Sequence, residues 1–268
     1  MLSSKPKLWV IGNWKMNPAT PQIQQQLTQQ LIEQTEQAQA SLAAVTLVVA
    51  PTLLHVQAVQ AQLHQADSVI QVAVQDIAQF APTGAYTGDV SAHLVAASQI
   101  PLCLIGHSER RSLHAESVQI LREKLQHATA AGLIVVFCVG ETLAEREAGQ
   151  ATQVVLAQLD AVFDSVALEV WQCQVIVAYE PVWAIGTGKT AQPEDAEAMH
   201  VAIRQGLKLY HSSLAGLSIL YGGSVKPDNA ASLAACANID GALVGGASLD
   251  ADSFIKIAQA FSQTSRVG

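Results

Sequence analysis

Eight short apolar runs recur along the chain, and they constrain its fold more than any other feature. Each run is rich in Val, Ile, Leu and Ala and is almost continuously hydrophobic, without a polar residue at every second position. This composition is typical of parallel strands that helices cover on both faces. The predicted strands are Leu8–Gly12, Val45–Ala50, Val69–Val74, Leu102–Ile105, Leu133–Val139, Gln174–Ala178, Leu217–Tyr221 and Gly241–Val244.

The longer segments between these runs have the period of amphipathic helices. Thr20 and Pro21 supply an N-cap and a first-turn proline, and Ile23 and Leu27 begin an apolar stripe among glutamines. Strands that alternate with helices predict a closed (β/α)8 barrel, with an open doubly wound sheet as the structural alternative. No Ser-, Gly- or Pro-rich linker divides the chain, so we expect residues 1–268 to form a single domain.

Composition argues against several classes of function. The chain has 14 Lys and Arg against 22 Asp and Glu, and the net charge of −8 disfavours a basic nucleic-acid-binding surface. No stretch long enough to span a membrane is purely apolar, and the apolar run after Lys7 is too short for a signal peptide. We therefore expect a soluble cytoplasmic protein with no nucleic-acid or membrane partner.

The cysteines are widely spaced, and each lies in or beside an apolar segment. This spacing offers no metal-ligand pair and no disulfide framework, so we expect buried free thiols. They are Cys103, Cys138, Cys173 and Cys236.

In a barrel of this kind, catalytic groups lie at the carboxyl ends of the strands and in the loops that follow. Asn13 and Lys15 follow the first predicted strand, His107 and Glu109 follow the fourth, and Glu180 follows the sixth. Lys15 in a barrel mouth is a fixed cation for an anionic substrate, although its amine could also extend into solvent.

Two of these side chains suit acid–base chemistry. His107 follows a glycine and precedes a predicted helix, whose N-terminus disfavours the protonated imidazole and leaves a neutral hydrogen-bond donor. Glu180 closes a hydrophobic strand, where partial removal from water makes a carboxylate a stronger base. A structural histidine and a salt-bridged glutamate are the alternatives that these residues leave open.

Glycines concentrate after the last three strands. Glycine lets backbone N–H groups approach a ligand closely, and barrels commonly bind phosphate in these loops. These glycines are Gly186, Gly188, Gly222, Gly223, Gly245 and Gly246, and Ser224 directly follows Gly223. A nucleotide cofactor is not expected, because Trp183 stands where a Walker A sequence needs its first glycine and no acidic residue follows at dinucleotide spacing.

Five segments combine these candidate residues in a recognisable order. They are Asn13–Asn17, Gly106–Arg111, Ala178–Lys189, Tyr221–Val225 and Val244–Leu249. Together they resemble the motif series of the triosephosphate isomerase family, and the resemblance extends over the whole chain. It implies a (β/α)8 barrel that interconverts dihydroxyacetone phosphate and D-glyceraldehyde 3-phosphate through an enediolate, without metal or organic cofactor.

The resemblance also implies a role for each candidate residue. Glu180 would be the base that moves a proton between two carbons, and His107 would polarise the carbonyl group. Lys15 and Asn13 would bind and neutralise the enediolate, and Glu109 would position this network. The implied phosphate-binding positions are Gly186, Ser224, Gly245 and Gly246.

Two loops carry further expectations. The loop Gln75–Asp89 is apolar, contains proline and is long for a simple connection, and the resemblance implies that it forms a homodimer with Thr87 reaching the partner's site. Asp76 and Asp89 stand where the family usually has Asn and Glu. The segment Pro181–Ala191 has stiff ends and a glycine-containing centre, which predicts a lid that closes over substrate.

Two other functions are alternatives. A glycoside hydrolase could use Glu109 and Glu180 as its carboxylate pair, but it would need aromatic platforms, and only 5% of the residues are aromatic. A non-catalytic scaffold would have no reason to keep Lys15, His107 and Glu180 together.

Overall fold

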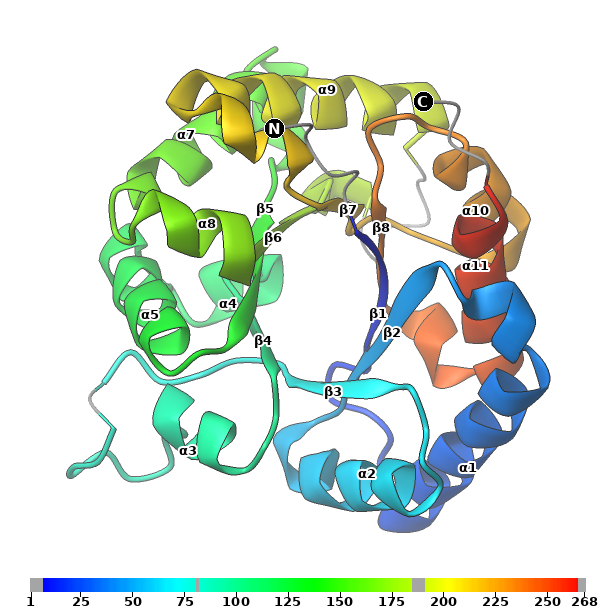
Figure 1. The fold of residues 1–268 in the computed structure, drawn as a ribbon. Coiled ribbons are helices and arrows are strands. Elements are labelled where there is room, and N and C mark those ends of the chain that lie inside the picture. Colours follow the sequence, from blue (N-terminus) through cyan, green and yellow to red (C-terminus); the bar gives the residue numbers. More distant parts are fainter. Residues whose placement is uncertain (1–6, 81, 185–190, 265–268) are drawn as a thin grey trace.

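The computed structural model describes residues 7–80, 82–184 and 191–264, which form a closed parallel barrel (Figure 1). The strands follow one another around it in chain order, and β8 pairs with β1 to close the ring. This arrangement confirms the predicted (β/α)8 fold and rules out the open sheet. The strands are β1 (Leu8–Asn13), β2 (Val45–Ala50), β3 (Gln71–Val74), β4 (Leu102–Ile105), β5 (Ile134–Val139), β6 (Val175–Tyr179), β7 (Ile219–Tyr221) and β8 (Gly241–Val244).

All eight predicted runs form strands, and their ends differ from prediction by two residues at most. The two largest differences are at β7, which begins at Ile219 and not at Leu217, and at β3, where Val69 and Ile70 precede the strand instead of opening it. Val69 is exposed, so its apolar side chain reflects no buried strand position.

The helices form a ring outside the barrel (Figure 1). As predicted, α1 begins after Thr20, whose hydroxyl accepts a hydrogen bond from the Ile23 N–H, and Pro21 occupies its first turn. The helices are α1 (Pro21–Gln37), α2 (Leu53–Gln65), α3 (Ala92–Ala97), α4 (Ser108–Leu113), α5 (Val118–Ala130), α6 (Leu143–Glu147), α7 (Ala151–Phe163), α8 (Leu168–Gln174), α9 (Pro193–Tyr210), α10 (Pro227–Ala234) and α11 (Ala251–Gln263).

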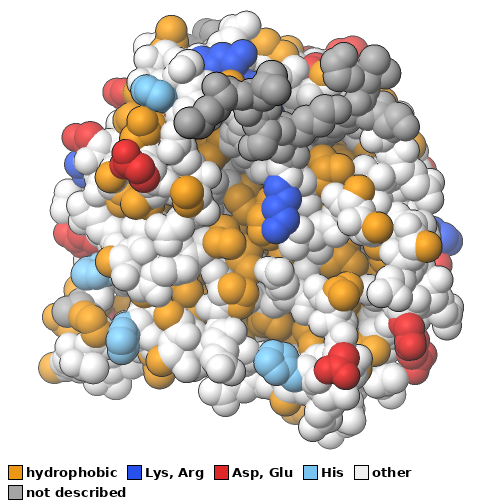
Figure 2. Space-filling view, in the orientation of Figure 1, with side chains coloured by type: hydrophobic (Ala, Val, Ile, Leu, Met, Phe, Trp, Pro, Cys, Tyr) orange, Lys and Arg blue, Asp and Glu red, His pale blue; other side chains and the backbone are white. Residues whose placement is uncertain are grey.

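The hydrophobic core has two layers. Alternate strand residues such as Ile11 and Leu104 fill the barrel, while their neighbours Val10 and Ile105 pack beneath the helices. Because both faces of each strand are buried, the strands need hydrophobic side chains at nearly every position, as the sequence shows. On the face drawn in Figure 2, charged side chains are scattered among hydrophobic and neutral ones.

The cysteine prediction is correct in part. All four thiols are free, and Cys103 and Cys138 are buried in strands. Cys173 is exposed and Cys236 is half-buried, so the prediction of burial is wrong for these two. On α8 the buried position belongs to Trp171, and a residue two positions further along a helix points away from that face.

Within the described ranges, no helix is both long enough and apolar enough to cross a membrane.

Candidate active site

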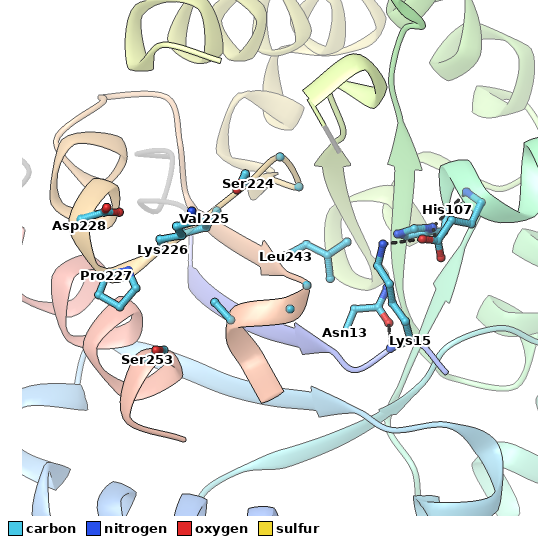
Figure 3. A pocket seen from close by; sticks show the side chains of 16 residues that line it. Asn13, Lys15, His107, Ser224, Val225, Lys226, Pro227, Asp228, Leu243 and Ser253 are labelled. Carbon is cyan, nitrogen blue, oxygen red and sulfur yellow. Dashed lines mark hydrogen bonds and ion pairs between the residues drawn. The ribbon is translucent and has the colours of Figure 1, made fainter. Parts of the chain in front are cut away.

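Four of the five polar residues predicted at the strand ends line one cavity of about 840 Å³ at the mouth of the barrel, and the fifth, Glu180, contacts His107 at its wall. Asn13, Lys15 and His107 lie together on one side of it, and Ser224 and Asp228 lie on the other (Figure 3). The sequence-predicted residues that line it are Asn13, Lys15, His107, Glu109, Gly222, Gly223, Ser224, Gly245 and Gly246.

Lys15 presents its ammonium group to this cavity under close restraint. Its Nζ lies 2.5 Å from Oε1 of Glu109, and its backbone N–H donates to Oδ1 of Asn13 at 3.0 Å. Both members of the ion pair are partly exposed, so the pair can also meet a ligand from the cavity. The predicted association of Asn13, Lys15 and Glu109 is therefore present in the structure.

The buried face of His107 is directed at Glu180. His107 Nε2 lies 2.9 Å from Oε1 of Glu180, and the other carboxylate oxygen accepts a hydrogen bond from the Ser108 N–H at 2.9 Å. The side chains of His107 and Glu180 are only 7% and 2% exposed. The contacts of this buried carboxylate are therefore with the His107 ring and the Ser108 N–H.

The hydrogen bonding of His107 fixes its tautomer. Nδ1 accepts a hydrogen bond from the Glu109 N–H at 3.2 Å, because His107 is the N-cap of α4. A ring nitrogen that accepts from an N–H group carries no proton itself, so the proton of the neutral ring is on Nε2. The sequence predicted a neutral donor from the helix N-terminus, and this contact supplies the geometry for it.

Two glycines make room for Glu180. A Cβ on Gly140 would lie 1.8 Å from the Glu180 carbonyl oxygen, and a Cβ on Gly222 would lie 2.9 Å from Glu180 Cγ. Gly222 was among the predicted glycines, but sequence reasoning missed Gly140. Its signal was a glycine directly after the fifth strand, beside Glu141.

Glu141, two residues after the end of β5, is a second buried carboxylate in addition to Glu180. Its Oε1 accepts hydrogen bonds from the Tyr179 hydroxyl at 3.1 Å and from Trp183 Nε1 at 2.8 Å. Burial and the neighbouring Glu141 carboxylate raise the pKa of Tyr179, which keeps its hydroxyl protonated as a donor. Glu141 thus anchors the first turn of the segment predicted to be a lid.

The glycine loop after β8 lies beside the lysine. A Cβ on Gly245 would lie 3.7 Å from Cε of Lys15, and the Gly245 carbonyl accepts the Ser248 N–H in the turn that follows. After β7, the Ser224 carbonyl accepts from Asn229 Nδ2 at 3.0 Å, which fixes that loop. Gly186 and the centre of the predicted lid, residues 185–190, lie outside the described residues.

Among the described residues, no group of three or more His, Cys, Asp or Glu side chains is arranged to hold a metal ion.

The fold and the site define a (β/α)8-barrel enzyme equipped for proton transfer on an anionic substrate. The family model for triosephosphate isomerase matches residues 8–261. The chain is 51% identical over 256 residues to the triosephosphate isomerase of Acinetobacter baylyi, covering 96% of each chain. It is 48% identical over 230 residues to that of Rhizobium etli, covering 85% of this chain and 100% of the relative.

The chain belongs to the triosephosphate isomerase family. It is an aldose–ketose isomerase that interconverts dihydroxyacetone phosphate and D-glyceraldehyde 3-phosphate, a glycolytic reaction. The glycoside hydrolase and the non-catalytic scaffold receive no support from these relatives.

Proposed function

We propose that Glu180 is the base of this isomerisation and that His107 is its electrophile. Glu180 removes a proton from C1 of dihydroxyacetone phosphate, and the electron pair moves onto the carbonyl at C2. Nε2–H of His107 hydrogen-bonds to the oxygen that becomes negative. The hydroxyl proton on O1 moves to O2, and the enediolate takes the carbon proton back from Glu180 at C2, which gives the aldehyde at C1. The contact of the Glu109 N–H with Nδ1 of His107 carries this proposal, because it leaves the only ring proton on Nε2.

Lys15 and Asn13 complete the proposed site. The enediolate and the phosphate are both anionic, and the Lys15 ammonium offers them a fixed positive charge in a protein of net charge −8. Asn13 accepts the backbone N–H of Lys15, and Glu109 pairs with its ammonium group. Glu109 is therefore a positioning residue. We assign phosphate binding to the backbone amides of the loops bearing Ser224, Gly245 and Gly246, together with the predicted Gly186.

Glu180→Gln tests the base. The amide keeps the size of the side chain but cannot accept a proton, and general base catalysis contributes roughly 10²–10⁴-fold. We expect kcat in a coupled isomerisation assay to fall by about that factor, with substrate-analogue binding retained. Glu33→Gln on the exposed face of α1 is the matched control and should leave kcat unchanged. Activity of Glu180→Gln within a few-fold of the parent would exclude Glu180 as the base.

We also propose that the enzyme is a homodimer through the loop Gln75–Asp89. The rings of Phe80 and Tyr86 stack at 4.2 Å, which gives this loop a defined shape. Leu54, at the start of α2, is 92% exposed and offers an apolar side chain for contact with a partner subunit. Sedimentation at micromolar concentration should show a dimer, and Leu54→Asp should weaken it; a fully active monomer would refute the proposal.

Residues 1–268 are proposed to act as one domain in the cytoplasm, where a glycolytic enzyme meets its substrate. In support, α11 near the C-terminus packs against α1, β1 and β2 near the N-terminus, so the ends of the chain close one structure. Limited proteolysis that released a folded half-length fragment would contradict the single domain.

A further inference from the structure

The backbone of Lys15 has an unusual conformation. Its φ is +52°, in the left-handed region, which costs free energy for any residue with a Cβ. Of the described non-glycine residues with positive φ, the other three each follow the C-cap of a helix, where this conformation is common. These three are Asp67, Gln99 and Ala115. Lys15 instead follows a strand, so its conformation needs another explanation.

Strained residues persist when their surroundings hold them, and Lys15 is held at three points. Asn13 accepts its backbone N–H, and Glu109 binds its ammonium. The third point is its carbonyl oxygen, which accepts a hydrogen bond from Nε2 of Gln75 at 2.7 Å. The first two residues were predicted from the sequence, whereas Gln75 was predicted only as the start of the interface loop.

Gln75 makes a second contact with the same amide group. Its Nε2 also donates to the carbonyl of Ala50 at 2.9 Å, so both amide hydrogens are used. Ala50 ends β2 and also accepts the N–H of Trp14, while Gln75 itself directly follows β3. One side chain therefore joins the carboxyl ends of β1, β2 and β3 beneath the catalytic lysine.

We propose that Gln75 is a positioning residue for the isomerase reaction, acting through the backbone of Lys15. By binding the Lys15 carbonyl, it maintains the left-handed turn that directs the ammonium toward Glu109 and the substrate. This inference rests on the proposed role of Lys15. On this inference Gln75, the first residue of the proposed interface loop, acts within its own subunit.

The test is Gln75→Met, which keeps the length of the side chain and removes both donors. The probe is 2-phosphoglycolate, whose carboxylate and phosphate mimic the charges of the enediolate. One hydrogen bond is worth about a factor of five in an equilibrium, and a displaced lysine adds to this. We expect titration calorimetry to show binding about tenfold weaker, with a similar fall in kcat/KM.

Gln60 provides a matched control within the same chain. Its Nε2 also donates to two carbonyls, those of Ser98 and Gln99, at 3.1 Å each. Gln99 also has a positive φ, +59°, but it lies after α3 and away from the cavity. Gln60→Met should therefore cost stability only, with 2-phosphoglycolate binding unchanged. Equal losses of affinity in both variants would overturn the proposal.

A double-mutant cycle separates positioning from general damage. If Gln75 acts through Lys15, then Gln75→Met should weaken 2-phosphoglycolate binding in the parent but not in Lys15→Met. Additive losses would overturn the positioning role. Normal affinity of Lys15→Met for 2-phosphoglycolate would instead refute the proposed role of Lys15. If Lys15→Met lost affinity and Gln75→Met did not, only the inference about Gln75 would be refuted.

A second variant guards against failure to fold. Gln75→Glu has the same shape, but its carboxyl group has no hydrogen to donate when ionised and only one when protonated, so at least one of the two bonds is lost. It should reproduce the loss of affinity. Sedimentation of each variant shows whether it is dimeric. Loss of affinity only in variants that have become monomeric would assign Gln75 to the interface and overturn the proposal.

Discussion

Lys124→Met should be among the most destabilising single substitutions in the helices that surround the barrel. Nζ of Lys124 lies 2.7 and 2.8 Å from the two oxygens of Asp76 and 2.6 Å from Oε1 of Glu116. Arg110 Nε also contacts both carboxylates, at 2.7 and 2.6 Å. Two cations and two carboxylates thus form a closed cluster, in which the Lys124 side chain is 4% exposed.

The size of the loss follows from this arrangement. Removing one partner of a buried ion pair costs about 3–5 kcal/mol, because the other charge remains buried. Here Arg110 still contacts both carboxylates and is itself one-third exposed, so water and one cation remain as partial compensation. Oε2 of Glu116, however, already has no hydrogen-bond partner among the described residues. We therefore expect a loss of about 3 kcal/mol.

The loss should depend on pH. Burial raises the pKa of Glu116, but Lys124 and Arg110 together lower it below its usual value. Ionised Glu116 therefore stabilises the fold above its unfolded pKa of about 4.3, and this contribution disappears as the pH falls through its lower folded value. Burial is the largest effect on Asp76 and raises its pKa, so ionised Asp76 contributes no such gain. Without Lys124 both carboxylates protonate more easily, and the variant's deficit should shrink from pH 8 to pH 5.

Urea denaturation at fixed protein concentration measures both effects, since the stability of the proposed dimer would depend on concentration. Lys256→Met is the control. It removes an exposed Lys256–Asp252 pair one turn apart on α11, and should cost less than about 0.5 kcal/mol. If Lys124→Met cost no more than the control, or lost more stability at pH 5 than at pH 8, the reasoning about the buried cluster would be wrong.

Two further predictions concern the site and the thiols. In Gly222→Ala the new methyl group would lie 2.9 Å from Glu180 Cγ and displace this proposed base, so kcat should fall 10- to 100-fold with less change in KM, measured by steady-state kinetics. A thiol reagent should label exposed Cys173 at once, but Cys103 and Cys138 only after unfolding, because burial raises the pKa of both thiols. Prompt labelling of Cys103 or Cys138 in the folded enzyme would contradict the second prediction.

The barrel could be predicted because its signals are local. Each strand is a short, continuously apolar run, which indicates burial on both faces. The start of α1 depends on the four residues from Thr20 to Ile23, which hold the N-cap and its hydrogen bond. The rule that barrel chemistry lies at the carboxyl ends of strands then selected Lys15, His107 and Glu180. The structure brings these side chains to one cavity or directly beneath it.

Contacts between distant residues could not be predicted in this way. The bond from Gln75 to Lys15 spans 60 residues, and that from Trp183 to Glu141 spans 42. Amide and carboxylate side chains are common at strand ends, and nothing in the local sequence states which distant carbonyl or indole each one meets. Only the closed barrel, which sets the ends of β1, β2 and β3 side by side, makes Gln75 a neighbour of Lys15.

Asp76 shows how the structure changes the interpretation of a departure from the family pattern. A carboxylate in place of the usual amide, at the base of the interface loop, adds a buried charge and by itself predicts a weaker interface. The structure pairs that charge with Lys124, 48 residues further along the chain, and with Arg110. Arg110 directly follows Glu109, which contacts Lys15, so the cluster that pairs with Asp76 also fixes α4, the helix that carries Glu109 and has His107 as its N-cap. The substitution is therefore accommodated within one subunit, and its effect should appear first in stability and in the placement of α4.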